Sequence, residues 1–132
     1  GWGYGSKKII DELYKIKPPF NVNKIAQLSA IESLKDYKFI KKSVKHNLNW
    51  SVKIKKFLEN KNIKTNKIAA NFFLLDFDSC KKSANYVAKK LENKGIILRS
   101  MESYKMKNKL RMTIGSIAQN KKFIKEIKNI LR

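Results

Sequence analysis

One alternating stretch near the end of the chain most constrains the fold. Residues Leu110–Ile114 place apolar side chains on either side of Arg111 and Thr113, which is the period-two pattern of a strand with one buried face. The apolar and aromatic run Asn71–Phe77 has the length of a buried strand. A third, short strand is predicted over Ile96–Arg99. The sequence therefore indicates a small sheet of a few mostly antiparallel strands.

Helical stripes of apolar residues flank these strands. We predict helices over Lys7–Lys17, Lys24–Leu34, about 37–59, about 79–93 and from about 117 onward. Their expected N-terminal caps are Asn23, Asp36, either Asp78 or Ser79, and Ser116 with Gln119. The apolar stripe of the second helix, for example Leu28 and Ile31, is expected to face inward. Gly95 is expected to be left-handed.

The remaining segments connect these elements. Asn60–Lys67 is predicted to be a loop or a short strand, and Met101–Asn108 a polar loop. The order of elements is typical of an α/β sandwich, in which helices cover a small sheet. No apolar run is long enough to span a membrane, and no signal peptide opens the chain. We therefore expect a cytoplasmic globular protein, either a fragment or a chain whose start has been removed.

The formal net charge is +21 at pH 7. A basic surface of this size could attract nucleic acid or an anionic membrane. However, 28 of the basic residues are lysines and three are arginines. Lys, Asn and Ile are residues that AT-rich codons favour, and the lysines form no long block. Codon bias with solvated helix faces explains the charge more simply than a nucleic-acid-binding surface.

The single Cys80 and the single His46 limit the chemistry. One cysteine allows no disulfide within the chain, and one Cys with one His cannot supply a structural zinc site. We therefore predict no metal. We expect His46 to be a surface residue and Cys80 an inert thiol.

Five motifs carry a family resemblance: Gly1-Trp2-Gly3-Tyr4-Gly5, Pro19-Phe20-Asn21-Val22-Asn23, Ala70-Asn71-Phe72, Gly95-Ile96-Ile97-Leu98-Arg99 and Leu110-Arg111-Met112-Thr113-Ile114-Gly115. Together, in their order and spacing, they resemble the C-terminal part of histidinol-phosphate aminotransferases. The resemblance covers essentially all 132 residues.

The resemblance implies a fold-type I enzyme that uses pyridoxal phosphate. Residues 1–21 would be the tail of the large cofactor domain, and residues 22–132 the C-terminal small domain. The lysine of the Schiff base and the arginine on the cofactor phosphate would lie before Gly1. No residue of this chain is therefore assigned to catalysis or to the cofactor, and the chain alone should not transaminate. The intact enzyme would be a homodimer.

Arg111 and Arg99 are the candidate substrate-binding residues. An arginine in so lysine-rich a chain suggests that its planar fork of donors matters. The resemblance assigns Arg111 to the α-carboxylate of a substrate such as glutamate. It assigns Arg99 to a second anion, the phosphate or side-chain carboxylate of substrate. The alternatives are a surface ion pair for Arg111 and an anchor of the loop Met101–Asn108 for Arg99.

Four further polar residues are weaker candidates. Asn21 is a possible site-lining residue, whereas Asn71 is expected to have a structural packing role. Asp76 and Asp78 are two positions apart and could share a face. Such a pair could do acid–base work or bind a cation. We favour instead a cap for Asp78 and a lysine partner for Asp76.

The predicted reaction is amino-group transfer between histidinol phosphate and glutamate or 2-oxoglutarate. Threonine-phosphate decarboxylases and aromatic aminotransferases share much of the same pattern, so they remain alternatives. The alternative from another class is a basic module that binds nucleic acid and stacks bases on Trp50, Phe72 or Tyr86. We disfavour it, because Phe72 lies in a run that is expected to be buried.

Overall fold

A computed structural model describes residues 3–132 of the chain. Gly1 and Trp2, which open the glycine-rich motif, lie outside the described residues. By its contacts the chain forms two units, Gly1–Phe39 and Ile40–Arg132. This division differs from the predicted boundary after residue 21, which concerns the whole enzyme and stays a prediction.

The first unit holds two helices, α1 (Lys7–Ile16) and α2 (Lys24–Lys35). The Asn23 side chain accepts a hydrogen bond from the backbone N–H of Ala26 at 2.8 Å, so the predicted cap of α2 is confirmed. No residue of α1 or α2 is buried. The expectation that the α2 stripe faces inward is therefore wrong for this chain by itself.

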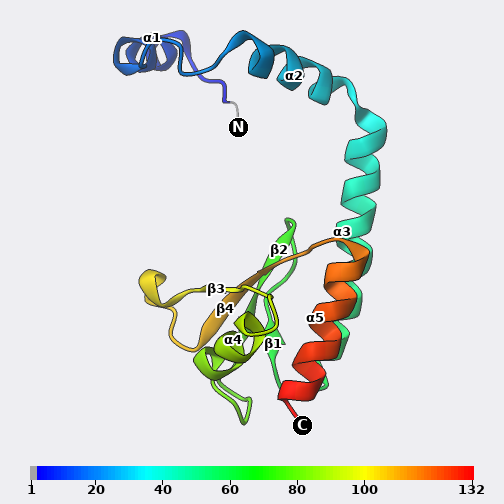
Figure 1. Ribbon diagram of the computed structural model, residues 1–132. Coiled ribbons are helices and arrows are strands. Elements are labelled where there is room, and N and C mark those ends of the chain that lie inside the picture. Colours follow the sequence, from blue (N-terminus) through cyan, green and yellow to red (C-terminus); the bar gives the residue numbers. More distant parts are fainter. Residues whose placement is uncertain (1–2) are drawn as a thin grey trace. The chain divides into compact units, whose positions relative to one another are not determined.

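The second unit continues through most of α3 and the rest of the chain (Figure 1). The elements are α3 (Tyr37–Glu59), β1 (Lys64–Thr65), β2 (Phe72–Asp76), α4 (Ala84–Glu92), β3 (Arg99–Ser100), a 3-10 helix η1 (Glu102–Tyr104), β4 (Lys109–Thr113) and α5 (Ile117–Ile130). The strands form one sheet in the order β1-β2-β4-β3, with antiparallel neighbours throughout. The predicted α/β class is confirmed.

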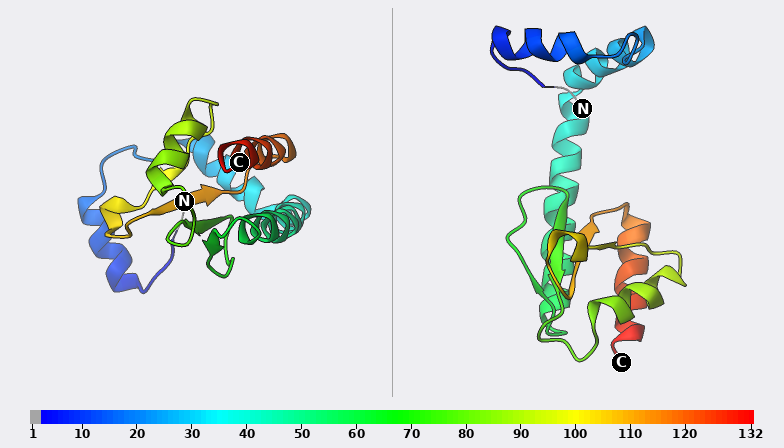
Figure 2. Two further views of the ribbon diagram at one scale, coloured as in Figure 1. Left: turned by 90° about the horizontal axis from the view of Figure 1, so that it is seen from below. Right: turned by 90° about the vertical axis from the view of Figure 1, so that its left-hand side faces the viewer.

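The sheet has one buried face and one open face. Alternation buries Phe73 and Leu75 of β2 on the same side as Leu110 and Met112 of β4. Side chains from α3, α4 and α5 complete this core: Ile54, Leu58, Ala84, Val87, Leu91, Phe123 and Ile127. Figure 2 shows these helices and strands from two further directions. The other face of the sheet carries Phe72, Leu74 and Asp76 of β2 together with Lys109 and Arg111 of β4.

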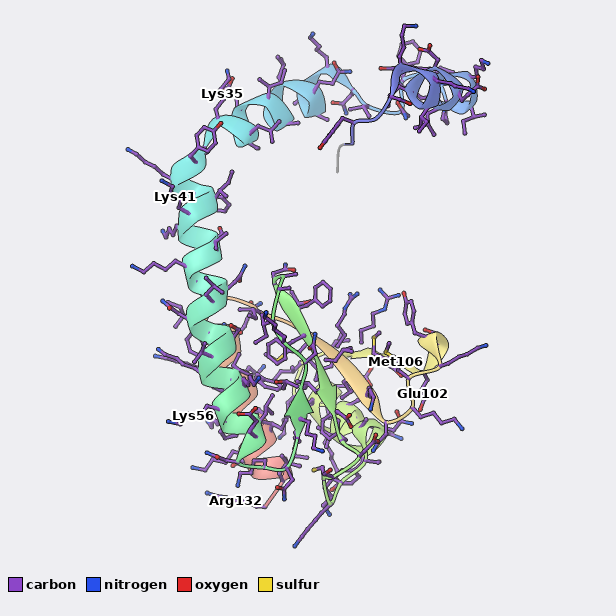
Figure 3. All side chains as sticks on the ribbon, turned by 180° about the vertical axis from the view of Figure 1, so that it is seen from behind. Lys35, Lys41, Lys56, Glu102, Met106 and Arg132 are labelled. Atoms are coloured by element: carbon purple, nitrogen blue, oxygen red, sulfur yellow. The ribbon has the colours of Figure 1, made fainter. Side chains whose placement is uncertain are left out.

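Three local predictions differ from the structure. Helix α4 is capped by Ser83, whose side chain accepts from the N–H of Tyr86, and not by Asp78 or Ser79. The predicted strand Ile96–Arg99 is reduced to Arg99–Ser100, because only these two residues pair with β4. The predicted loop Met101–Asn108 contains the turn of η1, and Glu102 and Met106 mark this loop in Figure 3.

Other local predictions are confirmed. Gly95 is left-handed with a φ of 72°. Asp36 accepts a hydrogen bond from the N–H of Phe39 at 2.9 Å and so caps the start of α3. Ser116 and Gln119 form the predicted capping box of α5. Among the described residues, no helix is both long and apolar enough to cross a membrane.

Candidate anion-binding site

The antiparallel pairing of β3 with β4 brings the two candidate arginines together. Arg99 and Arg111 are direct cross-strand partners. Leu110 and Met112 are buried on the core side of β4, and Arg111 between them is half-buried on the other face. Like charges placed directly opposite each other in a sheet repel. A bound anion that contacts both guanidinium groups would remove this cost.

Each guanidinium lies over an aromatic ring. The Cζ atom of Arg111 is 5.1 Å from the centre of the Phe72 ring, and that of Arg99 is 5.4 Å from the centre of the Tyr104 ring. Arg99 also donates a hydrogen bond from Nη2 to the Tyr104 hydroxyl at 2.9 Å. Arg99 is thus bound to the loop Met101–Asn108, as its alternative interpretation required. This contact uses one face and one donor, and leaves the other donors free.

Neither arginine has an acidic partner in the part of the chain that the structure describes. Within residues 3–132, each of the six ion pairs of the structure uses a lysine. The surface ion pair considered for Arg111 is therefore not present. The Nε atom of Arg111 is buried and has no hydrogen-bond partner among the described residues. A buried donor without a partner costs free energy, so no hydrogen bond of this atom within the described residues explains why Arg111 takes this position.

Both arginines line one cavity of about 760 Å³. Its walls are the segment Gly95–Leu98, the outer end of β4 and the first turns of α5, which add Lys122. No aspartate or glutamate occurs among the described residues that line it. The lining therefore includes three basic residues, and this composition suits a carboxylate or a phosphate ester as ligand.

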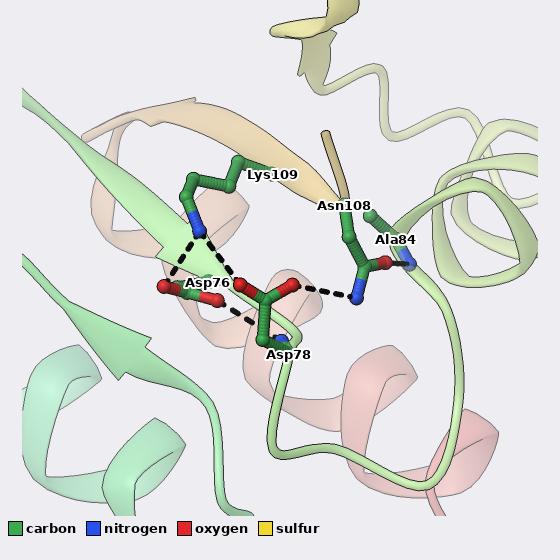
Figure 4. A network of polar contacts seen from close by, with 5 residues as sticks. All are labelled: Asp76, Asp78, Ala84, Asn108 and Lys109. Atoms are coloured by element: carbon green, nitrogen blue, oxygen red, sulfur yellow. Dashed lines mark hydrogen bonds and ion pairs between the residues drawn. The ribbon is translucent and has the colours of Figure 1, made fainter. Parts of the chain in front are cut away.

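The carboxylate pair lies elsewhere on the open face and is already engaged (Figure 4). Lys109 Nζ lies 2.7 Å from Asp76 Oδ2 and 3.1 Å from Asp78 Oδ2. The hydrogen bond from Lys109 lowers the pKa of Asp76 below its ordinary value, and the same bond raises the pKa of Lys109. The lysine partner predicted for Asp76 is confirmed. An acid–base or cation-binding role is not favoured.

Asp78 serves this network and not the helix cap that we expected. Asn108 donates a hydrogen bond from Nδ2 to Asp78 Oδ1 at 3.1 Å, and its Oδ1 accepts from the N–H of Ala84 at 2.7 Å. Asn108 is left-handed with a φ of 54°, which asparagine tolerates well. The side chain of Asn108 therefore fastens the start of β4 to the start of α4.

The other candidates do not join the arginines. Asn21 is exposed in a turn of the first unit and lines a separate cavity there. The carbonyl of Asn71 accepts from the N–H of Ile114 at 2.8 Å, which is a structural role. Cys80 is half-buried. No group of three metal-ligating side chains occurs in the part of the chain that the structure describes.

His46 is not the surface residue that we predicted. It is half-buried on α3, and its Nε2 lies 2.8 Å from the carbonyl oxygen of Gly115. Because a carbonyl only accepts, Nε2 carries the hydrogen in this bond. His46 therefore supports the connection between β4 and α5.

Sequence reasoning missed Phe72, Tyr104 and Lys122 as neighbours of the arginines. Phe72 was expected to be buried, yet it is 40% exposed. It faces Thr113 across the ladder, which makes it the diagonal neighbour of Arg111. This neighbour follows only from the strand register, and the register is not visible in either strand alone.

The chain is similar to known aminotransferases. The family model "Aminotransferase class I and II" matches residues 1–127. The histidinol-phosphate aminotransferase of Pelagibacter ubique is 56% identical over 131 residues, which are 98% of this chain and 36% of that protein. The chain thus spans about a third of the curated relatives that it matches.

Two solved structures share the fold. The histidinol-phosphate aminotransferase from Clostridium acetobutylicum has a TM-score of 0.83 at 23% identity, over 94% of this chain and 38% of that one. The histidinol-phosphate aminotransferase from Sinorhizobium meliloti, in complex with pyridoxal-5'-phosphate, has a TM-score of 0.77 at 20% identity, over 92% and 34%. With the family model matched over residues 1–127, the chain belongs to the aminotransferases of class I and II.

Proposed function

We propose that the protein containing this chain transfers an amino group between histidinol phosphate and glutamate or 2-oxoglutarate. The relative with 56% identity carries the name of this enzyme. The observation that carries the proposal is that Arg99 and Arg111 are cross-strand neighbours and line one cavity. No aspartate or glutamate occurs among the described residues of that cavity. Such an enzyme must accept a phosphate ester and a carboxylate in turn, and guanidinium groups bind either anion.

In this proposal Arg111 holds the α-carboxylate and Arg99 the second anionic group. Histidinol phosphate has no carboxylate; its phosphate ester stands where glutamate has its α-carboxylate, and both arginines of the cross-strand pair would contact that phosphate. Glutamate has two carboxylates, and binding both would fix its orientation, which is a large part of the catalytic effect in such enzymes. The chain would supply this substrate-binding wall. Asn21 belongs to the proposal as a residue that would line the site in the assembled enzyme.

Pyridoxal phosphate is the proposed cofactor of the whole protein, in which it would act as an electron sink. The described residues do not fit the task of holding it covalently. None of their lysines is buried, and Lys109 is paired with two carboxylates. We therefore propose that sequence outside this chain binds the cofactor, and that the chain alone does not transaminate.

The placement within the whole enzyme is also part of the proposal. Residues 1–21 would end the large cofactor domain, and residues 22–132 would form the C-terminal small domain. The intact protein would be a cytoplasmic homodimer. These assignments rest on the family resemblance of the five motifs.

The substitution Arg111→Lys in the full-length protein tests the proposal. Lysine keeps the charge but cannot form two parallel hydrogen bonds to a carboxylate. Loss of one charge-assisted bond corresponds to about a tenfold increase in KM for glutamate and histidinol phosphate. Arg132→Lys is the matched control, because Arg132 is exposed and outside the cavity. Equal KM values for the two variants would refute the proposed role of Arg111.

A further inference from the structure

Each of the two arginines is contacted by an aromatic ring and, within the described residues, by no carboxylate. Four lysines also lie over rings, but none of them lines the cavity: Lys17, Lys53, Lys82 and Lys90. In the described residues, side-chain ion pairs use lysines only. Arg111 and Arg99 instead lie over Phe72 and Tyr104. A carboxylate partner would neutralise a guanidinium and compete with an anionic ligand. An aromatic ring holds the planar group by its face and leaves the charge and the N–H donors available.

The position of Phe72 follows from the sheet, and that of Tyr104 from the turn η1 after β3. Strand β2 alternates, so that Phe73 is buried and Phe72 lies on the open face with Arg111. At 40% exposure the Phe72 ring contributes little buried apolar area to the core. Tyr104 belongs to the turn of η1, and Lys105 after it is left-handed with a φ of 60°. This turn returns the chain toward β3, and the Tyr104 hydroxyl reaches Arg99.

We propose that Phe72 and Tyr104 are positioning residues that hold Arg111 and Arg99 in the orientation needed to bind the anionic groups of the substrate. The inference rests on the proposed function, because it takes the arginine pair as the substrate-binding site. Neither ring contacts substrate in this proposal. Both act through the guanidinium that each supports, and they thereby determine affinity for anionic substrates.

The test uses the cofactor-loaded, full-length protein, with inorganic phosphate as the probe in calorimetry and histidinol phosphate in kinetics. Phe72→Leu keeps an apolar side chain and removes the ring. We expect the Kd for phosphate and the KM for histidinol phosphate to rise roughly three- to tenfold, with kcat nearly unchanged. Phe72→Tyr, which restores a ring, should return both values to within about twofold of the parent.

Substitutions of Tyr104 separate the contribution of its ring from that of its hydroxyl. Tyr104→Phe keeps the ring under Arg99 and loses only the hydrogen bond, whereas Tyr104→Leu loses both. The expected order of Kd for phosphate is therefore parent, Tyr104→Phe, Tyr104→Leu. Tyr86→Leu is the matched control, because Tyr86 is 42% exposed and lies under Lys82 and Lys90 but outside the cavity. It should leave both measurements unchanged.

Arg111→Met distinguishes the two hypotheses. If phosphate binds this variant as tightly as the parent, the proposed anion site itself is wrong. If Arg111→Met weakens binding while Phe72→Leu and Tyr104→Leu do not, only the positioning role is refuted. If Phe72→Leu weakens binding in the parent and has no further effect in Arg111→Met, Phe72 acts through Arg111, as we propose.

Discussion

Lys109 forms ion pairs with two carboxylates, and these pairs make the stability of the sheet depend on pH. It lies within ion-pair distance of Asp76 and Asp78, and its side chain is 24% exposed. The pKa of Asp76 is below its ordinary 3.8, chiefly because of the hydrogen bond from Lys109. The pKa of Lys109 is above its ordinary 10.5 for the same reason. Both charged forms are therefore stabilised by folding.

We predict that Lys109→Met lowers the free energy of unfolding of the chain at pH 7 by about 1 kcal/mol, since the pair is partly exposed. The contribution of Asp76 is complete above pH 3.8 and is lost as the pH falls through its lower folded value. The difference between the variant and the parent should therefore shrink below that pH. Urea unfolding followed at pH 7 and at pH 3 measures both values.

Lys35→Met is the control for this pH effect. Lys35 also has an acidic partner, Glu32, but the two side chains are 65% and 71% exposed. The control should change stability little at any pH. An equal loss for Lys109→Met at pH 7 and pH 3 would show that packing of the lysine stem, and not the ion pair, is what the substitution removes.

The residue types of this face could be read from sequence, but their contacts could not. The expectation that Arg111 projects away from the core was sound, because the alternation of β4 fixes it. The choice of Asp78 as a cap was wrong, because Asn108 and Lys109 engage its carboxylate and Ser83 then caps α4. Asn108 is 30 positions from Asp78, and no local pattern predicts such a contact.

The connection from β4 to α5 is held by side-chain hydrogen bonds to the backbone of Gly115. Asn120 is only 1% exposed, and its side chain bonds both to the N–H and to the carbonyl of Gly115. The same carbonyl accepts from His46 of α3. A Cβ atom at Gly115 would lie 2.6 Å from Oε1 of Gln119, in the capping box. The junction thus joins three elements through one glycine.

We predict that Asn120→Leu destabilises the chain by about 1–3 kcal/mol, because it removes a hydrogen-bond partner from each of two backbone groups of the half-buried Gly115. Asn129→Leu, an exposed asparagine on the same helix, is the matched control and should change stability little. Thermal unfolding of both variants measures the difference. Similar unfolding temperatures would mean that water satisfies the Gly115 groups as well as Asn120 does.

Elements followed from periodicity more reliably than their ends and contacts did. The capping box of α5 is local and was predicted from Ser116 and Gln119. The bond from His46 to Gly115 joins residues 69 positions apart and was not. Strand β3 was predicted too early in the chain, because Ile96–Leu98 is apolar but finds no partner strand. Pairing, and not composition, decides which apolar segment becomes a strand.

Helix α2 carries an apolar stripe that is exposed in this chain. Four large residues of α2 are about half exposed or more: Ile25 at 77%, Leu28 at 52%, Ile31 at 50% and Leu34 at 48%. Exposed patches of this kind are typical of interaction surfaces. The stripe was predicted correctly as a pattern, but a pattern does not say whether its partner lies in the same chain.

We predict that the isolated 132-residue chain binds the anionic dye ANS at the α2 stripe. Leu28→Lys combined with Ile31→Lys should reduce the dye fluorescence, although the added positive charges attract the dye. Gln27→Lys combined with Ala30→Lys adds the same charge at exposed positions of α2 and should not reduce it. Since the core lies in α3–α5 and the sheet, neither pair should alter unfolding of the second unit. Unchanged fluorescence in the first pair would place the dye elsewhere and would contradict the prediction that the α2 stripe binds it.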